Sequence, residues 1–367
     1  MLRDVQQLID EDLDYIIRKG SDAFDALSGS TLWFTGSAGF IGYYLCKAVA
    51  RFNAQNEPSK RIKLLALDNY SRGVPEWLND IRSDEISTIK HDVVDPIPAD
   101  WPTPNYIIHG ASIASPMFYR LHPLETIDAN VDGLRRYLDY AAEHKDDLAG
   151  MLYFSTSEIY GDPPADAIPT DETFRGYVSC TGPRACYDES KRLGETLCVT
   201  FAQVFDLPVK MARPFNNYGP GLKLQDGRVL PDFTKNALEG QDIVMLSDGA
   251  PTRTFCYIAD SVVGYLKILT RGGKGEPYNI GIEKPEISMR ELADTVVASA
   301  KDLWGYEGQV VLKQSEEADY LTDNPQRRCP DITKARTELD YNPEILVDDG
   351  ITRALNWYYY NRGGAVA

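Results

Sequence analysis

The chain has 367 residues, with 38 Lys and Arg against 55 Asp and Glu, and so a net charge of −17. This acidity disfavours nucleic acid and anionic membranes as main partners, because both require a basic surface. A hydrophobic fraction of 43% suffices for a sizeable core and argues against disorder. The six cysteines have no CxxC spacing and the four histidines are scattered, so the sequence predicts no metal site.

Residues 1–30 are expected to form a helical N-terminal extension. Apolar side chains recur at helical spacing over residues 2–28, which predicts one or two amphipathic helices. Charges every few residues exclude the apolar centre of a signal peptide. The uncharged stretch Ala26–Cys46 is broken by four glycines, so it is not interpreted as a membrane span. We expect a cytoplasmic protein with reduced cysteines.

From Thr31 onward, short apolar runs alternate with helical patterns. The predicted strands are Thr31–Thr35, Lys63–Leu67, Tyr106–His109, Met151–Ser155 and Pro208–Arg213. The predicted helices between them are Ile41–Asn53, Leu124–Glu143 and Arg184–Phe205. This alternation predicts an α/β fold, a Rossmann-type doubly wound parallel sheet, over residues 31–213. The pattern becomes irregular after Pro214, so residues 214–367 are expected to form mainly a smaller substrate-binding lobe, with some segments returning to the Rossmann domain.

A glycine-rich turn follows the first predicted strand. Gly36, Gly39 and Gly42 form GxxGxxG and enclose Phe40 and Ile41 at the start of the next helix. Glycines permit the sharp bend, and the helix N-terminus offers free N–H groups to a pyrophosphate. The turn therefore predicts a dinucleotide site.

Acidic residues follow the next two strands. Asp68 ends the second predicted strand and is followed by Asn69. A carboxylate there accepts hydrogen bonds from the adenosine ribose and repels a 2′-phosphate, which favours NAD over NADP. The polar insert Asn53–Arg61 explains the long spacing from the glycine turn. Asp92 and Val93 follow another short strand, where an aspartate can bond the adenine amino group.

Tyr187 and Lys191 form YxxxK, which places both side chains on one helix face. The ammonium is expected to lower the pKa of the phenol and to hold the nicotinamide ribose, leaving a tyrosinate as base. The pairs Tyr15/Lys19 and Tyr43/Lys47 share the spacing but lie elsewhere, and are expected to pack. Only Tyr187 follows a strand that ends in hydroxyls and a carboxylate, Ser155–Glu158, at the edge where catalytic groups belong.

These motifs resemble the extended short-chain dehydrogenase/reductases that act on nucleotide sugars. Residues 155–163 and 182–192 are most similar to the UDP-glucuronate decarboxylase family, as are residues 226–229 and 324–331. Residues 1–30 lie outside the resemblance. It implies NAD as cofactor, a UDP-sugar as substrate, Ala111 in the cofactor site and a homodimer formed through the Tyr187 helix.

The resemblance also implies the opening step. Tyr187, assisted by Thr156, takes the proton of the sugar 4-hydroxyl while a hydride leaves C4. A dehydratase then needs a general acid where this chain has Ser157, which has no suitable proton to give. A 4-keto uronic acid loses carbon dioxide without such an acid. Ser157 and Glu158 are therefore expected to position the sugar ring and to deliver the C5 proton.

The remaining candidates concern the substrate. Arg184 is either a partner of the sugar carboxylate or a structural support. The resemblance assigns diphosphate and nucleotide contacts to Asn216, Arg228, Val229, Arg253 and, more weakly, Arg328. The chain has Gly219-Pro-Gly-Leu222 where the decarboxylase family has Gly-Pro-Arg-Met, which leaves the exact sugar open. We expect a UDP-glucuronate decarboxylase, with a 4-epimerase, a 4,6-dehydratase and a non-catalytic dinucleotide-binding scaffold as alternatives.

Overall fold

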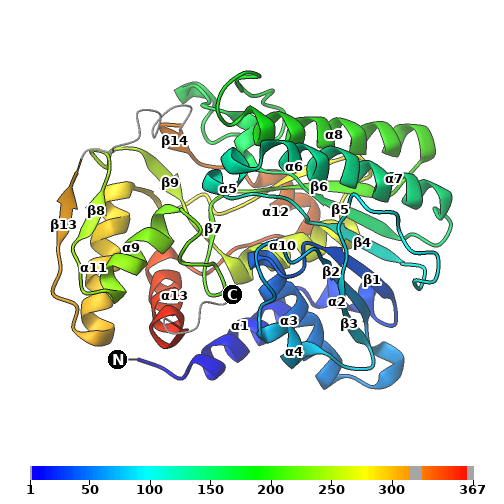
Figure 1. The fold of residues 1–367 in the computed structure, drawn as a ribbon, viewed down its shortest axis with the longest axis horizontal. Coiled ribbons are helices and arrows are strands. Elements are labelled where there is room, and N and C mark those ends of the chain that lie inside the picture. The colour runs from blue at the N-terminus through cyan, green and yellow to red at the C-terminus, as the bar shows by residue number, and fades with distance from the viewer. Residues whose placement is uncertain (1, 314–324, 362–367) are drawn as a thin grey trace.

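A seven-stranded parallel sheet forms the centre of the molecule (Figure 1). The computed structural model describes residues 2–313 and 325–361, and its strand order is β11-β6-β5-β4-β1-β2-β3. The strands are β1 (Thr31–Thr35), β2 (Lys63–Asp68), β3 (Ile86–Lys90), β4 (Tyr106–His109), β5 (Gly150–Phe154), β6 (Val209–Pro214) and β11 (Pro277–Ile280). The chain runs outward from β1 to β3 and then crosses to β4, so the strand order reverses between β1 and β4. This topology confirms the predicted Rossmann-type fold.

Helices cover both faces of the sheet, which is why its strands are buried apolar runs rather than alternating ones. One face carries α3 (Phe40–Gln55) and α10 (Ile258–Arg271), and the other carries α6 (Pro123–Asp128), α7 (Leu134–Glu143) and α8 (Ala185–Phe205). The predicted helix Leu124–Glu143 is divided by a π-helical turn, Ala129–Gly133. A Cβ on Gly133 would lie 2.6 Å from Val93, so the wider turn brings the backbone close to the segment after β3.

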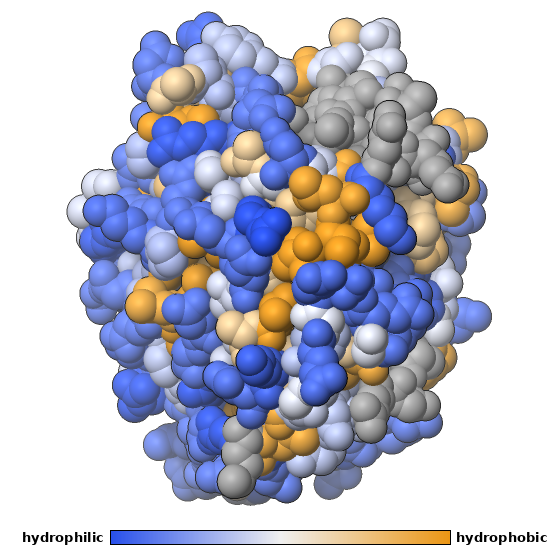
Figure 2. All heavy atoms as spheres, turned by 90° about the vertical axis from the view of Figure 1, so that its left-hand side faces the viewer, coloured by the Kyte–Doolittle hydropathy of each residue, from blue (hydrophilic) through white to orange (hydrophobic). Residues whose placement is uncertain are grey.

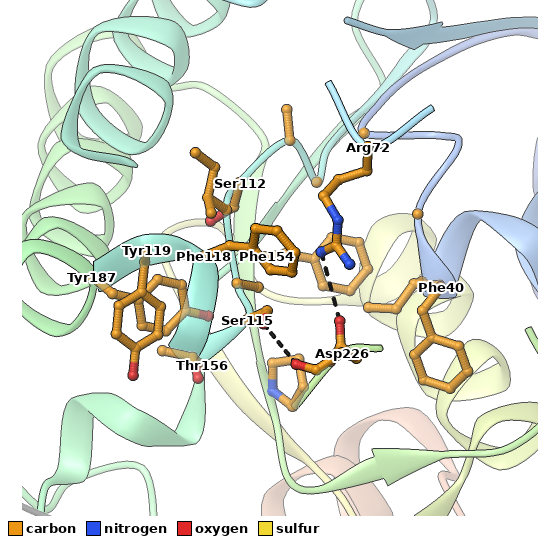
Figure 3. Close-up of a pocket in the computed structure, with 18 of the residues that line it drawn as sticks. Phe40, Arg72, Ser112, Ser115, Phe118, Tyr119, Phe154, Thr156, Tyr187 and Asp226 are labelled. Atoms are coloured by element: carbon orange, nitrogen blue, oxygen red, sulfur yellow. Dashed lines mark hydrogen bonds and ion pairs between the residues drawn. The ribbon is translucent and has the colours of Figure 1, made fainter. Parts of the chain in front are cut away.

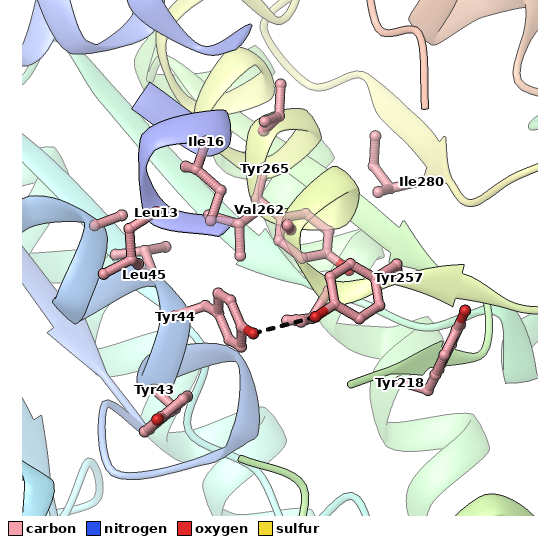
Figure 4. Packing of buried hydrophobic residues seen from close by; sticks show 14 of the residues in the cluster. Leu13, Ile16, Tyr43, Tyr44, Leu45, Tyr218, Tyr257, Val262, Tyr265 and Ile280 are labelled. Carbon is pink, nitrogen blue, oxygen red and sulfur yellow. Dashed lines mark hydrogen bonds between the residues drawn. The ribbon is translucent and has the colours of Figure 1, made fainter. Parts of the chain in front are cut away.

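The N-terminal extension forms α1 (Val5–Lys19) and α2 (Ser21–Leu27), which pack outside α3 and α10 as an additional layer. Leu13 and Ile16 point into this interface (Figure 4). Asp12 is also buried there, with 1% of its surface exposed. It accepts hydrogen bonds from the hydroxyls of Tyr44 and Tyr257, each at 2.6 Å, and from Arg353 Nη1 at 2.9 Å. We call these four residues the Asp12 cluster; it ties the extension to α3, to the start of α10 and to the C-terminal helix.

The smaller lobe lies on the left in Figure 1 and is built around three helices. They are α9 (Val229–Leu238), α11 (Met289–Trp304) and α13 (Val347–Asn361). Its short strands are β7 (Asn217–Tyr218), β8 (Ile243–Met245), β9 (Thr252–Thr254), β10 (Cys256–Tyr257), β12 (Glu286–Ser288), β13 (Val310–Leu312) and β14 (Arg327–Arg328). From the same half of the chain, α10, β11 and α12 (Thr333–Leu339) return to the central sheet.

Short elements complete the description. They are η1 (Pro58–Lys60), α4 (Trp77–Ile81), α5 (Pro116–Leu121), η3 (Ser157–Tyr160) and η4 (Ala165–Ala167). The lobe end of the molecule is predominantly hydrophilic, with a small group of apolar side chains near its centre (Figure 2). Among the described residues, every helix is too short or too polar to cross a bilayer.

Candidate functional site

A cavity of about 830 Å³ lies at the carboxyl edge of the central sheet and extends to the smaller lobe. All predicted site residues except Gly42 line it, although they come from ten segments of the chain. On the cofactor side these are Gly36, Gly39, Phe40, Ile41, Asp68, Asn69, Asp92, Val93 and Ala111. Towards the lobe they are Thr156, Ser157, Glu158, Arg184, Tyr187, Lys191, Asn216, Arg228, Val229, Arg253 and Arg328. The structure therefore brings the predicted residues together.

The glycine turn connects β1 to α3 at one end of the cavity. Gly36 has φ +76°, and a Cβ there would lie 2.7 Å from the backbone of Gly110 and Ala111. Gly42 lies in the first turn of the helix, where a Cβ would lie 1.9 Å from the Ser37 carbonyl oxygen. Its role is thus to seat the helix on the turn rather than to line the cavity. The N–H groups that open α3 are left for an anion.

Asp68 is fixed at the end of β2 by backbone donors. Its two carboxylate oxygens accept hydrogen bonds from the Ala38 N–H at 3.0 Å and the Tyr70 N–H at 2.8 Å. Burial raises the pKa of Asp68. Beside it, the Asn69 amide donates to Asp92 at 2.9 Å. The glycine turn and the Asp68 carboxylate fit the diphosphate and the adenosine ribose of a dinucleotide, respectively.

Tyr187 and Lys191 lie on α8 and are 6% and 2% exposed. Lys191 Nζ donates to the Phe154 carbonyl at 2.8 Å and lies 5.9 Å from the centre of the Tyr187 ring. Burial raises the pKa of Tyr187 to about 12, although a hydrogen bond with Thr156 opposes this. Burial also lowers the pKa of Lys191 to about 7. The expected lowering of the Tyr187 pKa is therefore wrong for this structure, because burial of the phenol has the largest effect on it.

The ring of Tyr119, on α5, stacks on that of Tyr187. The ring centres are 5.0 Å apart and the planes differ by 9° (Figure 3). Tyr119 is 1% exposed and lines the cavity. This contact restricts Tyr187 from the side opposite to its own helix.

Glu158, in η3, lies between two arginines. Arg184 pairs with one of its carboxylate oxygens and Arg328 with the other, and Arg184 also pairs with Asp188 at 3.3 Å. Burial alone would raise the pKa of Glu158, but Arg328 and Arg184 lower it to about 2. We call these four residues the Glu158 cluster. At neutral pH the Glu158 carboxylate carries no proton, which argues against the expectation that it delivers the C5 proton.

A third arginine, Arg253, lies beside this cluster. Arg253 on β9 is the register partner of Arg328 on β14, and it donates to the Thr252 carbonyl at 2.7 Å. Burial and the neighbouring Arg328 lower the pKa of Arg253 to about 10. Asn216 has φ +42°, and its amide donates to the Thr254 carbonyl at 2.9 Å. One end of the cavity thus has three arginines beside two carboxylates, an excess of one positive charge in a molecule of net charge −17.

Several lining residues were not predicted. They include Arg72, Ser112, Ser115, Phe118, Tyr119 and Lys223. All lie in loops or short helices without a periodic pattern, so only their position after strand ends could have indicated them. In the predicted motif of residues 324–331, Asn324 lies outside the described residues. The described residues contain no group of three or more His, Cys, Asp or Glu side chains arranged to hold a metal ion.

Comparison with known sequences shows to which family the chain is similar. The model of the NAD dependent epimerase/dehydratase family matches residues 33–281. UDP-glucuronic acid decarboxylase 6 of Arabidopsis thaliana is 35% identical over 328 residues, which cover 88% of this chain and 87% of that protein. UDP-glucuronic acid decarboxylase 1 of Xenopus tropicalis is 33% identical over 88% of this chain and 71% of that protein.

Solved structures show the same fold. An epimerase of Methanothermobacter thermautotrophicus superposes with a TM-score of 0.78 at 25% identity, over 95% of this chain and 97% of that one. The UDP-glucuronic acid 4-epimerase of Bacillus cereus, solved with UDP-glucuronic acid and NAD, gives 0.69 at 22% identity, over 89% and 98%.

Proposed function

Since the chain belongs to the NAD dependent epimerase/dehydratase family, we propose that it is an NAD-dependent decarboxylase of UDP-glucuronate that proceeds through a 4-keto sugar. The observation that carries this proposal is the Glu158 cluster, which places guanidinium groups and an ionised carboxylate beside Thr156 and Tyr187. With Arg253 beside the cluster the site has one more guanidinium than carboxylate, which suits an anionic sugar, and Ser157 supplies no acid at the place where a dehydratase needs one.

Residues on the cofactor side have a binding role in this proposal. The N-terminus of α3 holds the diphosphate, Asp68 accepts the adenosine ribose hydroxyls, and Lys191 binds the nicotinamide ribose. NAD, when bound, supplies a hydride acceptor for C4 of the sugar and later returns that hydride. Asn69, Asp92, Val93 and Ala111 line the adenine and ribose side of the same cavity.

Tyr187 accepts the proton of the sugar 4-hydroxyl, and Thr156 aligns the Tyr187 phenol with that hydroxyl. Because burial raises the pKa of Tyr187 to about 12, the phenol must first lose its own proton, and the amine of Lys191, whose pKa burial lowers to about 7, can take that proton. The ammonium that Lys191 then carries stabilises the tyrosinate as substrate and cofactor exclude water. Tyr119 keeps the phenol in line.

The 4-keto uronate is a β-keto acid. Its bond from C5 to the carboxylate breaks, carbon dioxide leaves, and the electron pair forms an enolate that then takes a proton at C5. A water held by Ser157 is the candidate donor of that proton. Glu158 keeps Arg184 and Arg328 in place, while Arg253, Asn216, Arg228 and Val229 contact the diphosphate and nucleotide. In this arrangement Arg184 supports Glu158 and Asp188.

The deciding experiment incubates the purified protein with UDP-glucuronate and NAD and follows product mass. A product lighter by carbon dioxide is expected. An unchanged mass with an altered sugar would instead identify a 4-epimerase, and loss of water from UDP-glucose alone would identify a dehydratase.

A single substitution tests the role of Tyr187. Tyr187→Phe should lower turnover at least about 1,000-fold, because the proton acceptor is lost, while the protein still binds NAD. Product formation and protein-bound NAD are measured together. Tyr177→Phe is the matched control, since Tyr177 is 66% exposed. Normal turnover of the Tyr187 variant would contradict the assignment.

We also propose a homodimer and a cytoplasmic location. On α5, α6 and α8 several apolar side chains are at least 39% exposed, which supports a partner on this face; they are Leu121, Leu124, Ile127 and Leu193. Sedimentation should give a dimer, and Leu124→Asp should give a monomer. All six cysteines are free, which suits a reducing compartment, and cell fractionation tests the location.

A further inference from the structure

Two loops from opposite sides of the cavity meet at Arg72 (Figure 3). Arg72 lies in the loop that follows β2, four residues after Asp68. Its guanidinium carbon is 3.8 Å from the centre of the Phe118 ring, and Nη1 is 3.7 Å from Asp226 Oδ1. The side chain therefore reaches from the cofactor side across to the segment that precedes α9.

A second contact joins the same two loops in the reverse direction. Lys223 Nζ donates to the Arg72 carbonyl oxygen at 2.6 Å. Lys223 immediately follows Gly219–Leu222, the segment in which this chain departs from the decarboxylase pattern. Within it Gly221 has φ +88°, and a Cβ would lie 2.7 Å from the Tyr43 ring, so only glycine lets this loop lie so close to α3. The glycine by which this chain differs from the decarboxylase pattern thus lets the loop lie where Lys223 reaches Arg72.

Asp226 is held independently of Arg72. Its carbonyl oxygen accepts a hydrogen bond from the Ser115 hydroxyl at 2.7 Å, and its carboxylate lies 2.9 Å from Arg228 Nε. The Asp226 side chain is 9% exposed, whereas that of Arg72 is 37% exposed. Asp226 and Phe118 therefore form a fixed surface on which the more exposed arginine rests.

We propose that Arg72, Phe118, Lys223 and Asp226 form a latch that retains NAD in the cavity between the two half-reactions. Arg72 belongs to the loop that starts at the ribose-binding carboxylate, so a dinucleotide leaving past Asp68 must displace it. The inference rests on the proposed function. In that reaction, the hydride removed from C4 must return to C4 after carbon dioxide has left and C5 has gained a proton. Release of the ketone would leave the hydride on the cofactor, and release of the reduced cofactor would carry the hydride away from the ketone.

The test compares NAD release from the full-length protein and from Arg72→Ala. NAD-loaded protein is passed into NAD-free buffer without substrate, and protein-bound NAD is followed with time. We expect release about tenfold faster in the variant, the effect of losing one cation–π contact and one ion pair. Arg82→Ala is the matched control, because Arg82 is an exposed arginine that does not line the cavity. Release at the wild-type rate from Arg72→Ala would overturn the latch.

A second variant covers the case in which Arg72→Ala does not fold. Lys223→Met removes the bond to the Arg72 carbonyl from the other loop and should speed release about threefold. In both variants added NAD at saturation should restore kcat, while the NAD concentration needed for half-maximal turnover rises. A lowered kcat at saturating NAD, with unchanged NAD release, would contradict the proposal. Faster NAD release without decarboxylation of UDP-glucuronate in any form would support the latch and reject the proposed function.

Discussion

Asp12 and Glu158 are both carboxylates enclosed by hydrogen-bond donors, yet their pKa values move in opposite directions. Asp12 has two phenol hydroxyls and one guanidinium around it, and burial, opposed by these donors, raises its pKa to about 6. Glu158 has two guanidiniums, and its pKa falls to about 2. One cation and two neutral donors do not outweigh burial here, whereas two close cations do.

The two clusters also differ in what they connect. The Asp12 cluster joins α1, α3, β10 and α13, and none of its residues lines the cavity, so its carboxylate serves the packing of the extension. The Glu158 cluster faces the cavity, where a quarter of the Glu158 side chain remains exposed. We therefore expect substitutions in the first cluster to change stability and those in the second to change turnover.

Asp12→Ala should have the largest effect. It leaves two buried hydroxyls and part of the Arg353 guanidinium without their acceptor, so we expect the free energy of unfolding to fall by about 3 kcal/mol. Urea unfolding followed by tryptophan fluorescence measures the change. Asp25→Ala on α2 is the control, because Asp25 is exposed. A loss below about 1 kcal/mol would mean that the cluster does not hold the extension.

Glu158→Gln should instead act on the reaction. Glutamine preserves the shape but removes the charge between Arg184 and Arg328, so the two cations repel each other and move. We expect kcat with UDP-glucuronate to fall about 100-fold, which corresponds to about 2.7 kcal/mol. The unfolding free energy should change less than in Asp12→Ala, because Arg184 keeps Asp188. If Glu158→Gln kept the wild-type kcat but lost much stability, the Glu158 cluster would serve stability and not turnover.

The pH dependence separates the clusters by sign. The pKa of Asp12 is raised in the folded state from 3.8 to about 6, so its contribution to stability is present below pH 4 and is lost as the pH rises through 6. Glu158 has a lowered pKa, and its contribution is lost as the pH falls from 4.5 towards 2. Relative to Asp12→Asn, the wild type should gain about 2 kcal/mol between pH 7 and pH 4. A constant difference between the two proteins over this range would show that Asp12 does not titrate there.

Most of the fold could be predicted from the sequence, because the strands of a parallel sheet are continuous apolar runs. β1 and β4 have the predicted bounds, and the glycine turn, Asp68 and the YxxxK pair all reach one cavity. Local patterns could not supply contacts between distant segments. Asp12 and Tyr257 are 245 positions apart, and Arg72 meets a loop 151 positions further on. Nor could spacing reveal that burial, rather than Lys191, has the larger effect on the pKa of Tyr187.

The smallest predicted effect tests how much each hydrogen-bond donor of the Asp12 cluster contributes to stability. Tyr44→Phe removes one of the two phenol hydrogen bonds and should lower the free energy of unfolding by about 1 kcal/mol. Because this bond lowers the pKa of Asp12, its loss should also move the pH transition to higher pH. In the Asp12→Ala background the same substitution should cost almost nothing, since the hydroxyl has already lost its acceptor. Tyr360→Phe is the control, as Tyr360 is 55% exposed. Equal costs in both backgrounds would mean that Tyr44 stabilises the fold by packing alone, and that the proton equilibrium of Asp12 is set by burial and Arg353.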